Sequence, residues 1–458
     1  MAFVLTNNIP DEEIPEVNYN IRLTYFLSMV VAMGGLLFGY DLVIISGTVP
    51  FFREYFHLNA ISTGWAVGCL NIGAALGSLF AGKLSDIFGR KKVLLFVAFM
   101  FALTGIGTGW ATGFYSFVIF RIFSGLAVGA AALVCPMYIA EVSPAGMRGK
   151  LVSYYQLAIV TGLLLAYVTN YLLLNSGENN WRWMFSSQAV PAILFFISLF
   201  FVSESPRWLI RKSKDIEAER VLKRIGGNGY AKEVAISIRL SFASEQKEHI
   251  KDLFHPRIKH ILFLGIIVAV FSQIDGQNSL FSYAPEIFNK AGLSQDSAFL
   301  QSIIVGAIFF VFTFISIYTI DKTGRKKLLL YGSVLLSADA LMLAIAFWLH
   351  LPAICILLFV LGFIAIYGAT LGPVTWVMLS EIFPNRVRGN AMAAATVSLW
   401  LANFLTTASF PVLKEHLGLP STFLIYSIVC FVYFLFVKAK LPETKGKSLE
   451  EIEHFLTR

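Results

Sequence analysis

Charged residues are scarce in this sequence. Asp, Glu, Lys and Arg make up 14% of the 458 residues, whereas soluble domains contain roughly 25%. Hydrophobic residues make up 57%, and the mean hydropathy is +0.71. This composition excludes an ordinary soluble domain and indicates a chain that lies largely in a membrane.

Cysteine and histidine are also rare. The four cysteines lie in apolar segments and form no CxxC pair, so neither a disulfide framework nor a zinc site is expected. None of the seven histidines lies deep in an apolar segment, and there is no HExxH motif, nucleophile elbow or phosphate-binding loop. The sequence therefore predicts no metal, no cofactor and no enzymatic activity.

The net charge of +8 does not indicate a nucleic-acid partner, because the basic residues form no single block. They lie in short runs between apolar segments, as membrane topology requires. The richer runs, such as "GKLSDIFGRKK" and "DKTGRKK", follow even-numbered apolar segments. Because Lys and Arg are retained on the cytoplasmic side, both termini are predicted to be cytoplasmic.

Twelve apolar runs are each long enough, at about 20 residues, to cross a membrane as a helix. They lie near 23–48, 60–82, 92–110, 114–140, 150–174, 183–203, 258–288, 298–320, 327–349, 353–383, 388–412 and 420–438. The predicted fold class is an all-α integral membrane protein with two six-helix halves. Its predicted parts are a cytoplasmic tail at 1–22, a half at 23–203, a cytoplasmic helical loop at 204–257, a half at 258–438 and a tail at 439–458.

The two halves repeat each other in sequence. "SDIFGRKK" at 85–92 recurs as "IDKTGRKK" at 320–327, and "YIAEVSPAGMRGK" at 138–150 recurs as "MLSEIFPNRVRGN" at 378–390. The similar offsets indicate duplication of a six-helix unit. Paired halves of this kind are the usual architecture of secondary transporters, which hold substrate between the halves.

An ordered set of motifs spans residues 35–452. It comprises "GRKK" twice, "YIAEVSPAGMRGK", "SESPRWL", "YAPEIF", "GPVTWVMLSEIFPNRVRG" and "LPETKGKSLEEI". This set resembles the sugar porter family of the major facilitator superfamily, most closely its bacterial xylose–proton symporter type and more distantly the facilitative glucose carriers. The resemblance implies proton-coupled import of a monosaccharide (a pentose, hexose or related polyol) by alternating access. A facilitative uniporter without ion coupling is the alternative.

The short tails and the lack of an N-x-S/T sequon favour a bacterial inner membrane. The expected partners are a sugar, a proton and membrane lipid, and the expected functional unit is a monomer.

One acid lies deep in the first apolar run. Asp41 lies 19 residues beyond Arg22, which corresponds to about 28 Å along a helix. Arg121 enters the fourth run from the other side, about 10 Å deep, so the two lone charges lie at similar depth and should pair. The residues alone leave open a permanent structural ion pair or a proton switch. The resemblance favours the switch, with Asp41 as proton carrier and Arg121 as its partner.

Amides and tryptophans in apolar helices are suited to bind a sugar, because they offer donors, acceptors and flat apolar faces. The candidates are Gln156, Gln273, Gln277, Asn278, Trp376, Trp400 and Asn403. The resemblance supports Gln156, Gln273, Asn278 and Trp376 and adds Phe38. Each amide could instead hydrogen-bond a neighbouring helix.

Several positions depart from the xylose-symporter pattern: Leu163, Gln188, Ser272, Ser282 and Leu399. These departures leave the preferred sugar and the coupling open. Asp275 is a further acid beside the predicted site. It could bind substrate or take part in proton coupling, or it could face an aqueous vestibule. No role is assigned to Asp339.

Mirrored charge clusters follow the second and fourth runs in one half and the eighth and tenth runs in the other. They comprise Asp86, Arg90, Glu141 and Arg148 in one half and Asp321, Arg325, Glu381 and Arg388 in the other. Topology alone explains the basic residues but not the recurring acids. The acids favour an inner gate in which ion pairs across the bundle close the cytoplasmic side.

Overall fold

The structure is a computed structural model that describes residues 19–243, 253, 255–384, 387–445 and 451. The described residues form helices and connecting turns, without a strand. The N-terminal half contains six membrane spans. Their helices are α1 (Ile21–Tyr55), α2 (Ala60–Phe88), α3 (Arg90–Gly109), α4 (Phe114–Val142), α5 (Arg148–Leu173) and, for the sixth span, α6 (Asn180–Ser186) with α7 (Ala189–Leu199).

The C-terminal half repeats this arrangement with two broken spans. Its helices are α10 (Pro256–Ile274) with α11 (Gln277–Lys290), α12 (Gln295–Thr323), α13 (Arg325–Trp348), α14 (Ala353–Ala369) with α15 (Leu371–Ile382), and α16 (Arg388–Lys440). The break between α10 and α11 falls at Gly276, which has a left-handed backbone conformation with a φ of 99°. Glycine adopts this conformation at little energetic cost because it has no Cβ atom.

The last helix, α16, accounts for two spans. Its 53 residues would extend for about 80 Å, far beyond the roughly 30 Å of membrane hydrocarbon. The backbone turns at Gly418, where φ is 78° and ψ is 165°. Eleven helical segments in the described part of the chain are long and apolar enough to cross a membrane, and this turn makes twelve spans. The predicted fold class is confirmed.

Close helix packing holds each half together. A Cβ atom on Gly39 of α1 would overlap the backbone oxygen of Ile159 in α5, and one on Gly162 of α5 would overlap that of Leu36 in α1. The missing side chains therefore allow the two backbones to touch, as is common between membrane helices. Between the halves, α2 packs along α16 and α5 packs along α12.

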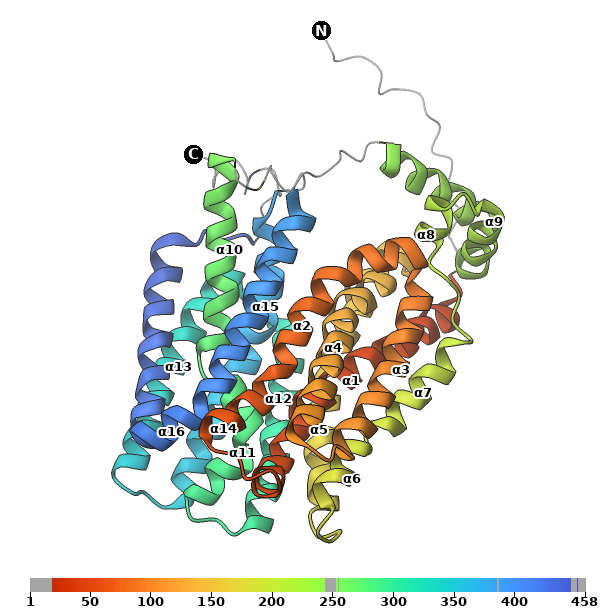
Figure 1. Cartoon of the computed structure of the whole chain (residues 1–458). Coiled ribbons are helices and arrows are strands. Elements are labelled where there is room, and N and C mark those ends of the chain that lie inside the picture. The colour runs from red at the N-terminus through yellow and green to blue at the C-terminus, as the bar shows by residue number, and fades with distance from the viewer. Residues whose placement is uncertain (1–18, 244–252, 254, 385–386, 446–450, 452–458) are drawn as a thin grey trace.

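The polar segment between the halves forms α8 (Pro206–Arg211) and α9 (Asp215–Ala243) at one end of the bundle (Figure 1). The backbone amide of Asn20, just before α1, donates to the carbonyl of Ile225 in α9 at 2.7 Å. The start of α1 and the polar segment therefore share one end of the molecule, and α1 ends at the opposite face.

Candidate functional site

Asp41 of α1 and Arg121 of α4 form a buried ion pair. Each residue is 1% exposed, and Nη1 of Arg121 lies 2.6 Å from Oδ1 of Asp41. The hydroxyl of Ser124, one turn after Arg121, donates to Oδ2 of Asp41. Thr104 of α3 donates to Ser124 at 3.1 Å. Both carboxylate oxygens are thus hydrogen-bonded, and the negative charge is balanced by the guanidinium.

Ser124 and Thr104 were not predicted. The i+3 spacing of Ser124 from Arg121 is a signal, because it places both side chains on one face of a helix. The other face of Arg121 is apolar. Its guanidinium lies 5.6 Å from the ring centre of Phe185, and its Nε has no partner among the described residues.

A cavity of about 110 Å³ lies between the two halves, so in this conformation it is smaller than most small-molecule sites. Eight of the predicted sugar-site residues line it: Phe38, Gln156, Gln273, Gln277, Asn278, Trp376, Trp400 and Asn403. Arg121 also reaches its wall. The cavity therefore connects the predicted binding residues with one member of the buried ion pair.

Some cavity amides are engaged with each other. The amide of Asn278 donates to the side-chain oxygen of Gln273 at 2.8 Å, and Gln273 donates to Ser272 at 3.2 Å. Asn71 of α2 donates to Asn403 of α16 at 3.2 Å and so joins the two halves. This contact is the alternative role considered for these amides, a hydrogen bond to a neighbouring helix rather than to a sugar. Asn71 was not predicted as a lining residue.

Besides Nε of Arg121, two polar atoms at the cavity have no partner among the described residues. They are the indole nitrogen of Trp400 and the side-chain oxygen of Asn71. A buried donor and a buried acceptor that remain unpaired are costly, and a ligand hydroxyl can satisfy both because it donates and accepts. The ring of Phe38, 5.7 Å from that of Trp400, adds an apolar surface.

Asp275 is the one predicted substrate-site residue that the structure does not place in the cavity lining. It is 1% exposed and is not among the residues that line the cavity. It lies behind the cavity wall, between the lining residues Gln273 and Gln277. Contact with substrate therefore finds no support in this structure.

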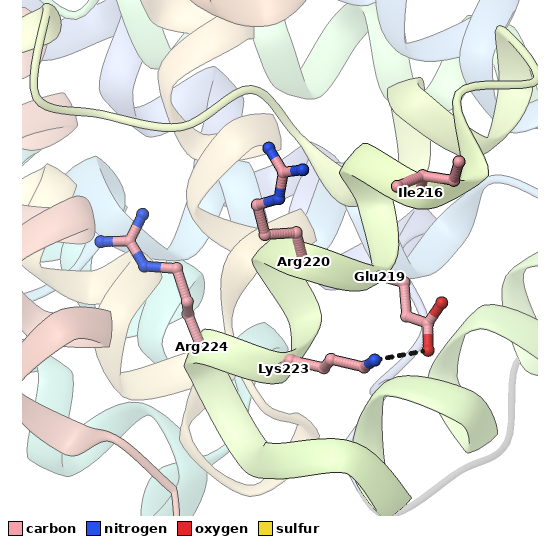
Figure 2. A pocket seen from close by; sticks show the side chains of 5 residues that line it. All are labelled: Ile216, Glu219, Arg220, Lys223 and Arg224. Atoms are coloured by element: carbon pink, nitrogen blue, oxygen red, sulfur yellow. Dashed lines mark ion pairs between the residues drawn. The ribbon is translucent and has the colours of Figure 1, made fainter.

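A shallow hollow on α9 is lined by Ile216, Glu219, Arg220, Lys223 and Arg224 (Figure 2). Lys223 and Glu219 form an ion pair at 3.0 Å, and both side chains are more than 40% exposed. Such pairs are typical of a solvated helix face.

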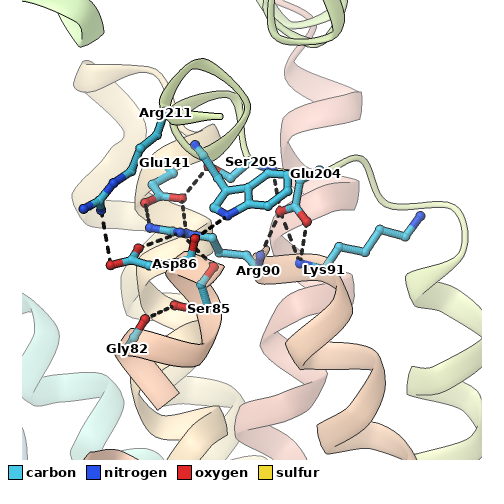
Figure 3. Close-up of polar contacts among 10 residues, drawn as sticks. Gly82, Ser85, Asp86, Arg90, Lys91, Glu141, Glu204, Ser205 and Arg211 are labelled. Atoms are coloured by element: carbon cyan, nitrogen blue, oxygen red, sulfur yellow. Dashed lines mark hydrogen bonds and ion pairs between the residues drawn. The ribbon is translucent and has the colours of Figure 1, made fainter. Parts of the chain in front are cut away.

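The predicted charge cluster of the N-terminal half centres on Arg90 (Figure 3). Its Nη2 and Nε each lie 3.0 Å from an oxygen of Glu141, and its Nη1 lies 2.9 Å from Asp86. Glu204 accepts a hydrogen bond from the backbone amide of Arg90 at 3.0 Å. Its negative charge therefore lies at the positive end of the α3 helix dipole. Burial raises the pKa of the Glu204 carboxyl.

The C-terminal half repeats much of this cluster. Arg325 pairs with Glu381 at 3.0 Å, and Glu443 accepts the backbone amide of Arg325 at 2.9 Å. The hydroxyl of Thr444 donates to Glu381 at 2.6 Å, as Ser205 donates to Glu141. The acids Glu204 and Glu443 were not predicted as helix caps, although both lie in repeated "SESPR" and "LPETK" segments.

The predicted ion pairs across the bundle are not seen among the described residues in this conformation, and the inner gate stays a prediction. The ion pairs that the structure describes for Arg90 and Arg325 join helices of one half rather than crossing the bundle. Arg148 is exposed at the start of α5, and Arg388 donates to the carbonyl of Phe383 at 3.2 Å. The side chain of Asp321 lies outside the described residues.

Among the described residues, an ion pair that does cross between the halves lies at the opposite end, where a second pair within the C-terminal half shares its carboxylate. Arg53, near the end of α1, lies 3.7 Å from Glu286 of α11, and Lys414 of α16 contacts the same carboxylate. None of the three was predicted, because each lies at the margin of an apolar run, where charges are ordinary.

Two six-helix halves around a central polar cavity define a secondary transporter of the major facilitator type. The sequence model of the "Sugar (and other) transporter" family matches residues 27–456. The chain therefore belongs to this family of membrane transporters, and it is not an enzyme.

Known proteins resemble the chain over nearly its full length. The arabinose-proton symporter of Bacillus subtilis (strain 168) is 37% identical, over 97% of this chain and 98% of its own. The D-xylose-proton symporter of Escherichia coli (strain K12) is 38% identical, over 95% and 96%. A solved inward-open conformation of the xylose transporter of E. coli matches with a TM-score of 0.85 at 36% identity, over 94% of this chain and 99% of that one.

Proposed function

We propose that this chain imports a monosaccharide together with a proton by alternating access. The observation that carries the proposal is Arg121, which contacts the buried carboxylate of Asp41 on one side and lines the polar cavity on the other. One residue thus links a group that can take up a proton to the place where substrate would bind. The arabinose and xylose symporters to which the chain is similar are proton-coupled by name.

Asp41 is the proposed proton carrier. In the present arrangement Arg121 and Ser124 stabilise its ionised form. When a proton binds Asp41, the ionic attraction to Arg121 is lost while both residues remain buried. Arg121 is then free to reorient along the cavity wall, so protonation alters the same surface that the sugar contacts.

The sugar is proposed to bind between the lining amides and aromatic rings. Its hydroxyls would pair with Gln156, Gln273 and Asn278, and its apolar faces would pack on Phe38 and Trp376. The unpaired indole nitrogen of Trp400 and the unpaired oxygen of Asn71 favour a ligand rich in hydroxyls. A pentose, a hexose or a related polyol fits this chemistry.

Alternating access is proposed to proceed by rocking of the halves about the cavity. The Arg53–Glu286 ion pair holds the halves together at the end opposite α8 and α9, so this conformation is closed on that side. The clusters around Arg90 and Arg325 brace each half separately. The inner gate would then form when the two braced ends meet.

The proposed setting is a bacterial inner membrane with both termini in the cytoplasm, and the proposed functional unit is a monomer. Lys and Arg on the α8–α9 end support this orientation. With it, the Arg53–Glu286 pair lies on the outer side.

The test uses purified protein in liposomes with a pH electrode outside, and individual pentoses, hexoses and polyols are added in turn. Symport predicts that one or more sugars make the external medium alkaline as protons enter with them. A sugar that crosses without proton movement would establish the facilitative uniporter instead. If no sugar crosses or exchanges, the proposed function is wrong.

A further inference from the structure

The seventh span contains a second buried acid, at the point where the span breaks. Asp275 lies between the end of α10 and Gly276, the left-handed residue that precedes α11. We propose that Asp275 is a second proton-binding group, which controls the hinge between α10 and α11. The part of this proposal that concerns sugar affinity rests on the proposed sugar transport.

The contacts of Asp275 differ from those of Asp41. Its Oδ1 accepts the backbone amide of Gln277 at 3.0 Å, whereas its Oδ2 is buried without a partner among the described residues. No described ion pair involves it. A buried carboxylate with neither a cation nor a full set of hydrogen bonds is strongly disfavoured. The carboxyl group therefore carries its proton in this conformation, while Asp41 is ionised beside Arg121.

Among the described residues, the surroundings of Asp275 contain titratable groups but no cation. The groups that face it are Tyr367 of α14 and Tyr426, Cys430 and Tyr433 of α16. All are neutral at physiological pH in ordinary conditions. The thiol of Cys430 donates to the backbone oxygen of Asp275 at 3.8 Å. None of these groups can balance a negative charge on the carboxylate.

The hinge is clamped against the second segment of α16. A Cβ on Gly276 would meet the ring of Tyr426, and the hydroxyl of Tyr426 is hydrogen-bonded to Ser279 of α11 at 2.9 Å. Loss of the Asp275 proton breaks its O–H bond and transfers the proton to water, so the carboxylate needs water or a cation beside it. Water can reach it only if the junction of α10 and α11 moves away from α16.

Such a movement would change the sugar site directly. Gln273 precedes the hinge, Gln277 and Asn278 follow it, and all three line the cavity. Gln273 and Asn278 are hydrogen-bonded to each other across the break. Protonated Asp275 therefore keeps these amides in the arrangement seen here, and ionised Asp275 separates them. Sugar affinity should depend on this proton independently of Asp41.

The first test is infrared spectroscopy of the purified full-length protein over a pH series. We expect a carbonyl band of a protonated carboxylic acid at neutral pH, which Asp275→Asn removes and Asp275→Glu shifts. Asn keeps the acceptor for the Gln277 amide, so the hinge geometry is retained. If the band is absent at neutral pH, or survives Asp275→Asn unchanged, the proposal is overturned. This outcome does not depend on any sugar.

The second test measures sugar affinity against pH in the Asp41→Asn background. We expect the sugar affinity of this variant still to change with pH, by up to about tenfold per pH unit, as for one linked proton. The double variant Asp41→Asn/Asp275→Asn should lose this pH dependence. Asp339→Asn is the matched control, because Asp339 of α13 also has an unpartnered buried oxygen but lies away from the hinge. It should leave the dependence intact. If Asp275→Asn also leaves the pH dependence of sugar affinity intact, the proposal is wrong and Asp275 only caps α11.

Discussion

Arg53 and Glu286 form an ion pair between the two halves of the molecule, with 3.7 Å between Nη1 and Oε1. Lys414 contacts the same carboxylate from α16. Arg53 is 39% exposed, but Glu286 and Lys414 are 17% and 12% exposed, so the carboxylate is partly shielded from water and salt.

We expect Glu286→Gln to weaken this closed end. Partly exposed ion pairs contribute about 0.2–1 kcal/mol each, so the population ratio of closed to open molecules at this end should fall by a factor of about 1.4 to 5. Spin labels placed on the facing ends of α1 and α11 report that population as a distance distribution. Glu415→Gln is the control, because Glu415 is exposed beside Lys414. Unchanged distances for Glu286→Gln would show that the pair does not hold the halves together.

The indole nitrogen of Trp400 provides a prediction for the cavity. Trp400→Phe keeps an aromatic ring and removes only the unpaired donor. If that donor bonds a sugar hydroxyl, affinity should fall by about 0.5–1.5 kcal/mol, or roughly three- to tenfold. Trp110→Phe, at a position 49% exposed and outside the cavity, should leave affinity unchanged. Equal affinities for wild type and Trp400→Phe in a binding titration would remove Trp400 from the polar part of the site.

Close contact of α1 and α5 provides a prediction for stability. An added methyl group on Gly39 meets the backbone of Ile159, and backbone cannot rotate away as a side chain can. Gly39→Ala should therefore destabilise the protein by about 1–3 kcal/mol, the usual cost of overpacking. Gly113→Ala, where nothing lies within 4 Å, should be nearly neutral. Thermal unfolding midpoints in one detergent compare the two, and equal midpoints would contradict the packing argument.

Glu204 provides a prediction for pH. Burial raises its pKa above the ordinary 4.5, so between these two values the folded state holds a proton that the unfolded chain has released. Stability contributed by this group is then present below pH 4.5 and is lost as the pH rises through the folded pKa. Glu204→Gln should flatten that part of the stability profile measured from pH 4.5 to about 7. The exposed Glu233→Gln should not, and an unchanged slope in Glu204→Gln would assign the effect elsewhere.

Features that depend on periodicity and depth could be predicted from the sequence. Long apolar runs must become helices in lipid, and the twelve spans could be predicted for this reason. Asp41 and Arg121 are each alone at matching depth, so their contact follows from the cost of leaving either unpaired. The amides that line the cavity were predicted because few polar side chains interrupt these helices.

Other features depend on backbone conformation or on which side of a helix faces inward. Glu204 and Glu443 cap helices through backbone amides that are exposed only because Gly89 and Gly324 adopt positive φ values of 99° and 95°. Asp275 lies two residues from the lining residue Gln273, but residues two apart on a helix do not share a face, and Asp275 is not among the residues that line the cavity. The placement of the cross-half ion pair depends on which end of the bundle is closed, and sequence spacing does not determine this.

The most direct test of the account measures transport by Asp41→Asn in liposomes, in two assays on the same preparation. Asn keeps the size of Asp but cannot carry a proton. We predict that sugar counterflow, which needs no net proton movement, persists, while the accumulation ratio driven by a proton gradient falls to about one. Retention of proton-driven accumulation by Asp41→Asn would contradict the assignment of Asp41 as the proton carrier.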